Sequence, residues 1–412
     1  MAFESSPIMA PFKGVVSNLP PHLTPKNSFD KLANMLVYRG RLITRPRLNS
    51  FSSSPDGKTI WDMIPFTDIL GYRHNLILTA LDAYMLTNNP LTWNELTAQA
   101  WSSSPTYQAN DIVLYNGTTY FAVASSTNEV PPNTTYWAPL NGNIIAAAVP
   151  YGYDIAQGRV YFSNGSFVGL YSDGEATIKS SLCPGAWQFC GMLANHLVAC
   201  NMTEPPPQVP NSQALPFRVR WSSSGNATLW TISTATSAGF VDLLDVSDVI
   251  SGFSVNGWIG VVYHPKGLEM MTPTGNGTAP FSFTQITHSP KGVGNFYPYS
   301  LDTYGAVSTF VSEEDVYTFD GSSLNPIGGE AKDKIFADLQ TAPTSSIVGS
   351  IIGRFNAGFL YWSYWLSSPS SVSGYVAGQP VTWVYSFTAK SWHPVYASTA
   401  LPQLSALANF AI

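Results

Sequence analysis

The stretch Gly257–Tyr263, GWIGVVY, shows the pattern that decides the fold of this chain. A turn residue is followed by a short run of apolar residues, most of them β-branched or aromatic. Runs of this kind predict strands bounded by tight turns. Five further runs follow an Asn or a Gly in the same way, and they are Leu76–Ala80, Arg159–Phe162, His196–Cys200, Ala306–Val311 and Phe359–Trp365.

The six runs recur about every 45 residues once one insertion is set aside, and such a period with four short strands per unit is typical of a β-propeller. We therefore expect an all-β fold, a β-propeller of six blades made of short antiparallel strands. A pair of β-sandwiches uses the same strands and turns and is the alternative. One helix is expected, over Glu330–Leu339, because apolar residues there recur at helical spacing.

The composition limits the class of protein. Charged residues make up 11% of the 412 residues and aromatic residues 13%, which excludes global disorder. The formal net charge is −6, so the chain as a whole does not attract nucleic acid. The longest apolar runs are far shorter than the roughly 20 residues that span a membrane. The first residues lack the basic and apolar regions of a signal peptide, so we expect neither a membrane span nor a secretory signal.

Composition also divides the chain into three parts. Residues 98–141 carry seven aromatic residues and their own turns, so we expect them to form an inserted β-subdomain. Residues 51–97 and 142–412 hold the strand runs of the propeller. Residues 1–50 are expected to form an N-terminal arm with a first strand. The basic cluster of that arm consists of Arg39, Arg41, Arg45 and Arg47. Arginines that alternate along one strand are typical of subunit contacts, so we predict that they contact another subunit or an adaptor, with DNA as the other option.

No catalytic or cofactor motif stands out. Ser54–Trp61 resembles the Asp-box of sialidases, but an Asp-Gly turn before a core tryptophan explains it. The acidic group Glu313–Asp315 falls at a predicted strand turn, where solvated carboxylates are ordinary. Cys183, Cys190 and Cys200 lack the close spacing of a zinc site and are expected to pack as small hydrophobic residues. We therefore expect no enzyme activity, no cofactor and no metal, with a sialidase-like propeller glycosidase as an alternative.

The insertion has a motif of its own. Its residues Ala100 to Trp137 follow the spacing A-W…Y…N-D-x-V-x-Y-x-G-x-x-Y-x-A…P…W. This is similar to the small chitin-binding module of the carbohydrate-binding family 5/12 type. The resemblance implies a three-stranded miniature sheet with Trp101, Tyr120 and Trp137 in its core. Ala124 and Ser125 occupy the stretch in which sugar-binding members carry exposed aromatic residues.

A glycan-binding reading of this subdomain is kept as an alternative. In that reading the chain is an adhesin or receptor-recognition protein, and the insertion is its binding site. Stacking on a sugar needs an exposed aromatic ring. The candidate platforms are Tyr107, Tyr115 and Phe121.

Four motifs in chain order resemble segments of bacteriophage tail-hub or nozzle proteins. They are the Asn27–Pro46 segment with its Gly-Arg turn, the R-W-S strand within Phe217–Trp230, the hairpin Tyr317–Gly328 and the closing strand pair Trp383–Trp392. The resemblance implies a structural virion protein of a tailed bacteriophage. Six copies would form a ring of the tail hub, nozzle or head-to-tail connector, which retains packaged DNA and provides the channel for its ejection.

The resemblance also implies partners and a location. The partners would be further copies of the chain, the phage adaptor or portal and other tail proteins. Double-stranded DNA would pass through the ring, and the adhesin alternative adds a host surface glycan. The protein would lie in the tail of the virion after assembly in the host cytoplasm. A weakly acidic balance suits a channel that does not hold the DNA moving through it.

Overall fold

The structure is a computed structural model that describes most of the chain. The described residues are 35–38, 41–44, 54–58, 60–88, 91–140, 147, 149–205, 211–233, 235–244, 248–286, 292–341, 351–356, 358–365 and 380–396. For residues 35–38 and 41–44 the description covers the backbone alone.

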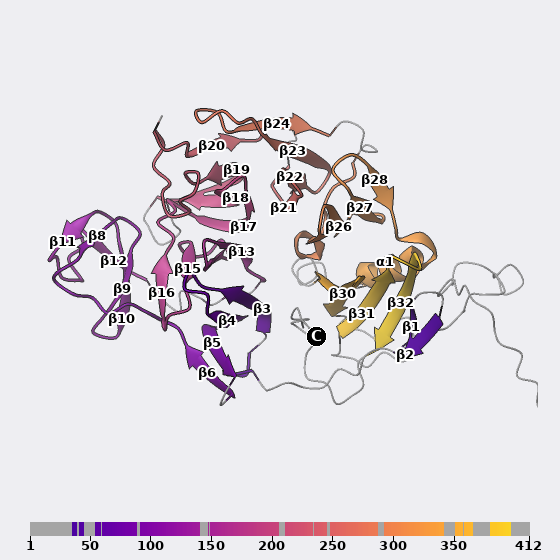
Figure 1. Cartoon of the computed structure of the whole chain (residues 1–412), viewed down its shortest axis with the longest axis horizontal. Helices are drawn as coiled ribbons and strands as arrows, with labels where there is room; N and C mark the ends of the chain where they lie inside the picture. The colour runs from indigo at the N-terminus through magenta and orange to yellow at the C-terminus, as the bar shows by residue number, and fades with distance from the viewer. Residues whose placement is uncertain are drawn as a thin grey trace, which may run out of the picture.

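Six sheets surround a common centre in the described part of the chain, and each contains four consecutive antiparallel strands (Figure 1). Five of them have these four strands alone, and the other has an added parallel strand at its edge. This arrangement is a six-bladed β-propeller, which confirms the predicted fold class. The first three blades consist of β3 (Ile60–Thr67), β4 (Arg73–Thr79), β5 (Ala83–Asn88) and β6 (Leu91–Glu95); β13 (Gly152–Ala156), β14 (Arg159–Ser163), β15 (Leu170–Ser172) and β16 (Thr177–Ser180); and β17 (Ala186–Leu193), β18 (His196–Glu204), β19 (Gln213–Trp221) and β20 (Gly239–Asp242).

The other three blades follow in chain order. They consist of β21 (Gly252–Asn256), β22 (Ile259–His264), β23 (Gly267–Pro273) and β24 (Phe281–Gln285); β25 (Asp302–Tyr304), β26 (Val307–Val311), β27 (Val316–Phe319) and β28 (Leu324–Pro326); and β29 (Ile352–Asn356), β30 (Phe359–Trp365), β31 (Pro380–Ser386) and β32 (Ser391–Tyr396).

The six apolar runs of the sequence overlap the second strands of the six blades. All of β22 is buried, and so is β14 from Val160 onward. A second strand is covered on both faces by neighbouring blades, so both sets of its alternating side chains are apolar. The first strands lie nearer the centre, where β13, β17, β21, β25 and β29 contact one another in turn.

The insertion forms two small sheets between blades 1 and 2. One has the order β12 (Trp137–Pro139), β10 (Thr118–Ala122), β9 (Ile112–Tyr115), and the other pairs β8 (Thr106–Tyr107) with β11 (Ser126–Thr127). Just before it, β7 (Thr97–Ala98) adds to the outer edge of blade 2, parallel to β16. Ala98, the first residue of the predicted insertion, therefore belongs to the edge of a blade.

The helix α1 (Lys332–Thr341) lies within two residues of its predicted position, after the short 3₁₀ turn η2 (Gly329–Ala331). Its Ile335 and Leu339 are buried in a cluster with Trp362 and Trp383 of blade 6. The helix therefore covers a blade, as its apolar spacing predicted. Among the described residues, no helix is both long enough and apolar enough to cross a membrane.

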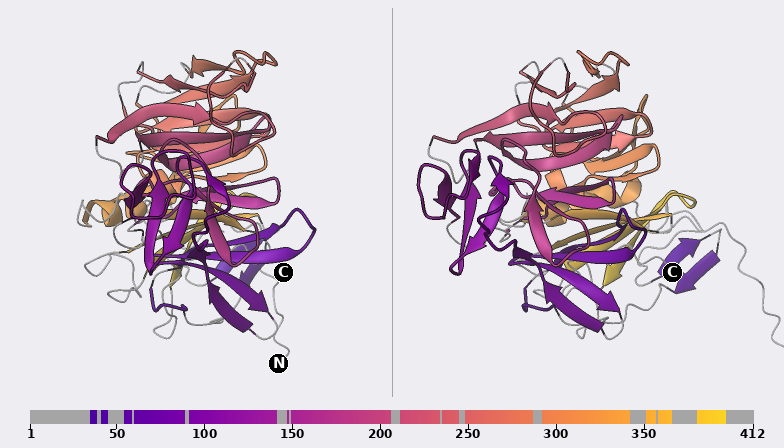
Figure 2. Two further views of the ribbon diagram at one scale, coloured as in Figure 1. Left: turned by 90° about the vertical axis from the view of Figure 1, so that its left-hand side faces the viewer. Right: turned by 60° about the vertical axis from the view of Figure 1, so that its left-hand side comes forward.

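An N-terminal hairpin lies outside the blades. It pairs β1 (Met35–Tyr38) with β2 (Arg41–Thr44) and forms no ladder with any other strand that the structure describes. β1 contacts β31 and β32 of blade 6. The side views show this hairpin and the insertion on opposite sides of the propeller (Figure 2).

Candidate functional site: the axial cavity

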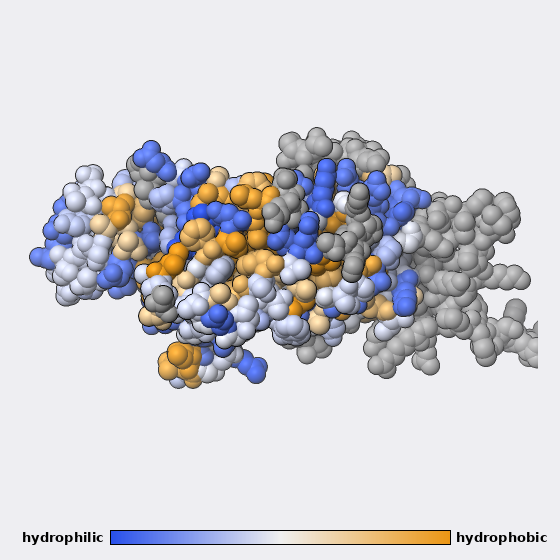
Figure 3. Space-filling model, turned by 90° about the horizontal axis from the view of Figure 1, so that it is seen from above, coloured by the Kyte–Doolittle hydropathy of each residue, from blue (hydrophilic) through white to orange (hydrophobic). Residues whose placement is uncertain are grey.

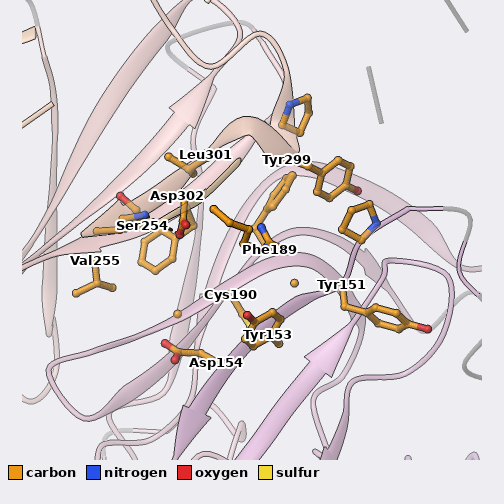
Figure 4. A pocket seen from close by; sticks show the side chains of 17 residues that line it. Tyr151, Tyr153, Asp154, Phe189, Cys190, Ser254, Val255, Tyr299, Leu301 and Asp302 are labelled. Atoms are coloured by element: carbon orange, nitrogen blue, oxygen red, sulfur yellow. Dashed lines mark hydrogen bonds between the residues drawn. The ribbon is translucent and has the colours of Figure 1, made fainter. Parts of the chain in front are cut away.

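A cavity of about 340 Å³ lies where the first strands of blades 2 to 6 converge (Figure 4). Its walls are largely aromatic, because Tyr153, Phe189, Phe253 and Tyr299 line it. Its charged lining groups are Asp154, Asp302 and Arg354. Such a concave, mostly apolar space with a few polar groups is the kind of place where function is first sought.

The side chain of Asp154 joins blade 2 to blade 3 through hydrogen bonds. Its Oδ1 accepts the N–H of Ile155 at 2.7 Å, and its Oδ2 accepts the N–H of Met192, on the first strand of the next blade, at 2.6 Å. Burial raises the pKa of the Asp154 carboxyl group. Both oxygens are engaged by backbone donors, so this carboxylate acts as a bridge between blades.

Asp302 repeats this arrangement between blades 5 and 6. Its Oδ1 accepts the N–H of Thr303 at 2.8 Å, and its Oδ2 accepts the N–H of Phe355 at 2.5 Å. Burial raises the pKa of Asp302 as well, against the opposing effect of the nearby Arg354. Asp154 and Asp302 thus each use one oxygen for the N–H of the next residue and the other for a backbone N–H of the adjacent blade.

The seam between the last blade and the first is bridged by an ion pair. Arg354 of β29 donates through Nη2 to Oδ1 of Asp62 on β3. Burial raises the pKa of Asp62 to about 6, although Arg354 opposes the shift. Asp62 Oδ2 is buried and has no hydrogen-bond partner among the described residues. The ion pair therefore links the last blade to the first and closes the circle of six blades. Forming it removes two charged side chains from water, which costs free energy.

The thiols and other candidate groups are structural in this arrangement. Cys183, Cys190 and Cys200 are buried and free, and burial raises the pKa of each thiol, so none is a ready nucleophile. In the part of the chain that the structure describes, no three His, Cys, Asp or Glu side chains gather as a metal site would require. Asp56 of the Asp-box-like stretch accepts bonds from Ser54 and Thr79, as a turn residue does.

The predicted basic cluster falls mostly outside the described residues. Arg41 is the first residue of β2, and nothing is described of its side chain. Arg39, Arg45 and Arg47 lie outside the described residues altogether. Their predicted contact with a subunit or adaptor stays a prediction.

The aromatic residues predicted for the core of the insertion come together. Trp137 is 1% exposed and clusters with Tyr107, and the half-buried Trp101 and Tyr120 pack against the same cluster. The Trp137 indole N–H donates to the carbonyl of Glu129 at 2.8 Å. This small core is built almost entirely from aromatic rings, as a sheet of three short strands requires.

The glycan platforms proposed from the sequence need correction. Tyr107 is buried edge-on against Trp137, and its hydroxyl accepts the N–H of Ser102. Phe121 has no exposed surface, because it belongs to the core that the insertion shares with blades 1 and 2. Neither ring offers a face on which a sugar could stack. Tyr115 is half-buried and packs edge-on against Trp101.

Replacing Phe121 with alanine is expected to lower the free energy of unfolding by about 3–5 kcal/mol, because its ring joins the insertion to the propeller core. Urea unfolding followed by tryptophan fluorescence measures the change. Val130→Ala is the matched control in the same subdomain, since Val130 is exposed, and a change within about 0.5 kcal/mol is expected for it. Equal stability of the two variants would contradict the shared core.

Sequence reasoning did not single out Asp62, Asp154, Asp302 or Arg354. A weak signal exists near the start of two first strands, because Asp154 lies two residues after Gly152 and Arg354 lies directly after Gly353. That signal becomes visible only when the first strands of the blades are aligned, which requires the blade boundaries. The partners of these residues are on other blades, and no local pattern contains them.

No protein-family model and no curated protein matches the chain. Among solved structures, it is similar to the computationally designed Ika8 protein, with 10% identity and a TM-score of 0.35 over 81% of this chain and 86% of the other. Hsv2p of Kluyveromyces lactis follows with 9% identity, a TM-score of 0.30 and coverage of 82% and 98%. For a puromycin hydrolase the values are 9%, 0.36, 85% and 55%, so this chain spans about half of that one. Because these TM-scores are low, the fold is assigned from the order of the strands in the sheets and not from the similarity to these structures.

Proposed function

We propose that this chain is a structural protein of a tailed-bacteriophage virion. In the proposal, copies of it form a ring of the tail hub, nozzle or head-to-tail connector, six being the number that the sequence resemblance implies. The ring retains packaged DNA and provides the channel through which the DNA leaves. The chain then serves as a structural component of the ring. The carboxylates of Asp154 and Asp302, which line the axial cavity, hold neighbouring blades together.

The observation that carries the proposal is a set of large apolar side chains exposed on one side of the propeller. They stand at the turns between the first and second strands of blades 1, 4 and 5, and such turns lie on the same face of a propeller. The exposed residues at these turns are Ile69 (81%), Leu70 (78%), Tyr72, Trp258 (71%) and Tyr304. Apolar residues grouped on one face mark a surface that is covered in an assembly.

The low charge of the surface also supports assembly. Hydrophobic and hydrophilic residues are intermixed over the side of the molecule seen in Figure 3, and hydrophobic residues gather across its middle. Charged residues are depleted at the cores of protein interfaces, so this composition suits contact with other proteins.

Three of the four sequence motifs that resemble phage tail proteins fall on described strands, and most of the fourth, Asn27–Pro46, lies outside the described residues. The R-W-S motif ends β19, where Trp221 is buried and its indole N–H donates to the carbonyl of Ser237. The Tyr317–Gly328 motif contains the β27–β28 hairpin, and Trp383 and Trp392 lie on β31 and β32. These three motifs therefore coincide with strands of the blades, which is compatible with the resemblance.

The proposal is tested on the purified full-length chain. We expect light scattering and negative-stain electron microscopy to find rings, either for the chain alone or after addition of portal and adaptor proteins from the same phage. A chain that stays monomeric under both conditions, and binds neither partner, would contradict the proposed function.

A further inference from the structure

The aromatic rings that line the axial cavity come from four different elements. Tyr153 lies on β13, Phe189 on β17 and Phe253 on β21, while Tyr299 lies on the 3₁₀ turn η1 (Pro298–Ser300) just before β25. Figure 4 shows Tyr153, Phe189 and Tyr299 around the same space. The centroids of the Phe189 and Tyr299 rings are 6.1 Å apart. This aromatic wall therefore exists only in the folded propeller, where blades 2 to 5 meet.

These rings are held in place by their neighbours. The side-chain amide of Gln188 donates from Nε2 to the Tyr299 hydroxyl at 2.5 Å. The ring of Phe253 lies so close to Gly191 that a Cβ on that glycine would be 2.8 Å from the Cε1 atom of the ring. The wall is thus formed before any ligand arrives, which lowers the free-energy cost of binding.

Two carboxylates line the same cavity from different sides. Asp154 belongs to blade 2 and Asp302 to blade 5, and blades three positions apart in a circle of six lie across the axis from each other. Among the described residues that line the cavity, Arg354 is the only cation, and it is paired with Asp62. No ion pair between described residues includes Asp154 or Asp302. One arginine among three carboxylates leaves negative charge in excess.

Both carboxylates can accept further hydrogen bonds. Each oxygen of Asp154 and Asp302 accepts one backbone N–H. A carboxylate has about four lone-pair sites, so each group can take at least one more donor. Burial raises the pKa of both carboxyl groups, and a cation close by would favour their charged forms. The cavity therefore suits a ligand that brings positive charge together with N–H donors.

We propose that the axial cavity binds a linear aliphatic diamine in its diammonium form. One ammonium group donates to Asp154 and the other to Asp302, and such charge-assisted hydrogen bonds are about twice as strong as neutral ones. The aromatic rings contact the methylene chain and the ammonium groups, since a cation is attracted to the face of an aromatic ring. The cavity volume of about 340 Å³ falls in the range of about 300–1,000 Å³ that is usual for small-molecule sites. The inference goes beyond the proposed function, because it concerns a single copy of the chain.

Other classes of ligand fit the cavity less well. Mg²⁺ and Ca²⁺ require about six or more oxygen ligands, whereas much of this wall is aromatic. An anion would meet two carboxylates, and the one arginine among the described lining residues is already paired. A neutral ligand would leave Asp154 and Asp302 without a counterion.

The test is isothermal titration calorimetry on the full-length chain with three probes of equal carbon-chain length. Putrescine is a diamine, butylamine carries one amine, and butanediol is neutral. We expect putrescine to bind one site per chain, butylamine to bind about tenfold more weakly because it reaches only one carboxylate, and butanediol to give no binding heat. Putrescine should also raise the melting temperature, since it binds the folded chain and not the unfolded one.

Two variants alter the cavity, and each has a matched control outside the described lining. Asp302→Asn removes one carboxylate, and its control is Asp320→Asn at an exposed turn of the same blade. Tyr153→Leu removes one ring, and its control is Tyr304→Leu, since Tyr304 is 61% exposed. Both cavity variants should weaken putrescine binding about tenfold, and both controls should bind like the wild type. Thermal unfolding of every variant verifies that it is folded, and Tyr153→Leu alone suffices if Asp302→Asn is not.

The outcomes decide between a diamine site and its alternatives. Tighter binding of putrescine than of both analogues, weakened only in the cavity variants, supports the inference. No binding of putrescine to the wild type overturns it, and so does equal binding of putrescine and butanediol, which would mean that charge is not recognised. Equal weakening in the control variants would place the diamine on the outer surface and overturn it. Displacement of putrescine by an equal concentration of Mg²⁺ would assign the carboxylates to a metal ion, with the same consequence. Ring assembly is measured without putrescine, so it is independent of these outcomes.

Discussion

The Arg354→Met variant should lose about 3–5 kcal/mol of unfolding free energy at pH 8, because it leaves the Asp62 carboxylate buried without its partner. The loss should be clearly smaller at pH 5. The folded-state pKa of Asp62 is raised to about 6, so a neutral carboxyl group stabilises the fold at low pH, and that contribution is lost as the pH rises through about 6. Urea unfolding at the two pH values measures both effects.

Two further variants verify that the seam is responsible. Adding Asp62→Asn to Arg354→Met should recover at least half of the loss at pH 8, because no charge is then left buried. Lys179→Met removes a more exposed cation that pairs with Asp173 and Glu175, and it should cost no more than about 1 kcal/mol. A loss of unfolding free energy that does not change with pH, or an equal loss for Lys179→Met, would contradict the role of the Asp62–Arg354 pair in joining the last blade to the first.

Gly152→Ala is expected to destabilise the propeller by about 1–3 kcal/mol or more, because blades 2 and 3 approach too closely for a side chain there. A Cβ on Gly152 would lie 2.2 Å from the carbonyl oxygen of Gln188 and 2.9 Å from the Cα of Phe189. Both contacts are backbone atoms on the neighbouring first strand, so relief requires the blades to separate. Thermal and urea unfolding, followed by the twelve tryptophans, measure the loss.

The matched substitution is Gly277→Ala, at an exposed glycine with no atom within 4 Å of its added Cβ. It should be neutral or slightly stabilising, because alanine restricts the unfolded chain. If both alanine variants unfold alike, the close approach of blades 2 and 3 is not a constraint on the fold.

The architecture was predictable because propeller blades are local units. The second strands are largely buried on both faces, so runs such as Ile259–Tyr263 are apolar and are visible without any alignment. The turn residues beside them are equally local, and α1 was visible from its apolar spacing. The aromatic core of the insertion was predictable for the same reason, because Trp101 and Trp137 lie within one short motif.

The candidate site was not predictable, because its contacts join residues that are far apart in the chain. Asp62 and Arg354 are 292 residues apart, and Asp154 reaches Met192 on the next blade. Phe121 was misread because an aromatic residue on a small sheet faces either solvent or a neighbouring domain. The sequence of the insertion does not contain the blades against which that ring packs.

The sequence alone thus determined the repeated blade and the inserted subdomain, since strand propensity and turn chemistry belong to neighbouring residues. Only the tertiary structure decided which carboxylates bridge the blades, which rings are buried and which ion pair closes the ring. Those properties depend on the distance between surfaces that meet only after six sheets have packed around one axis, and burial and pairing follow from that packing.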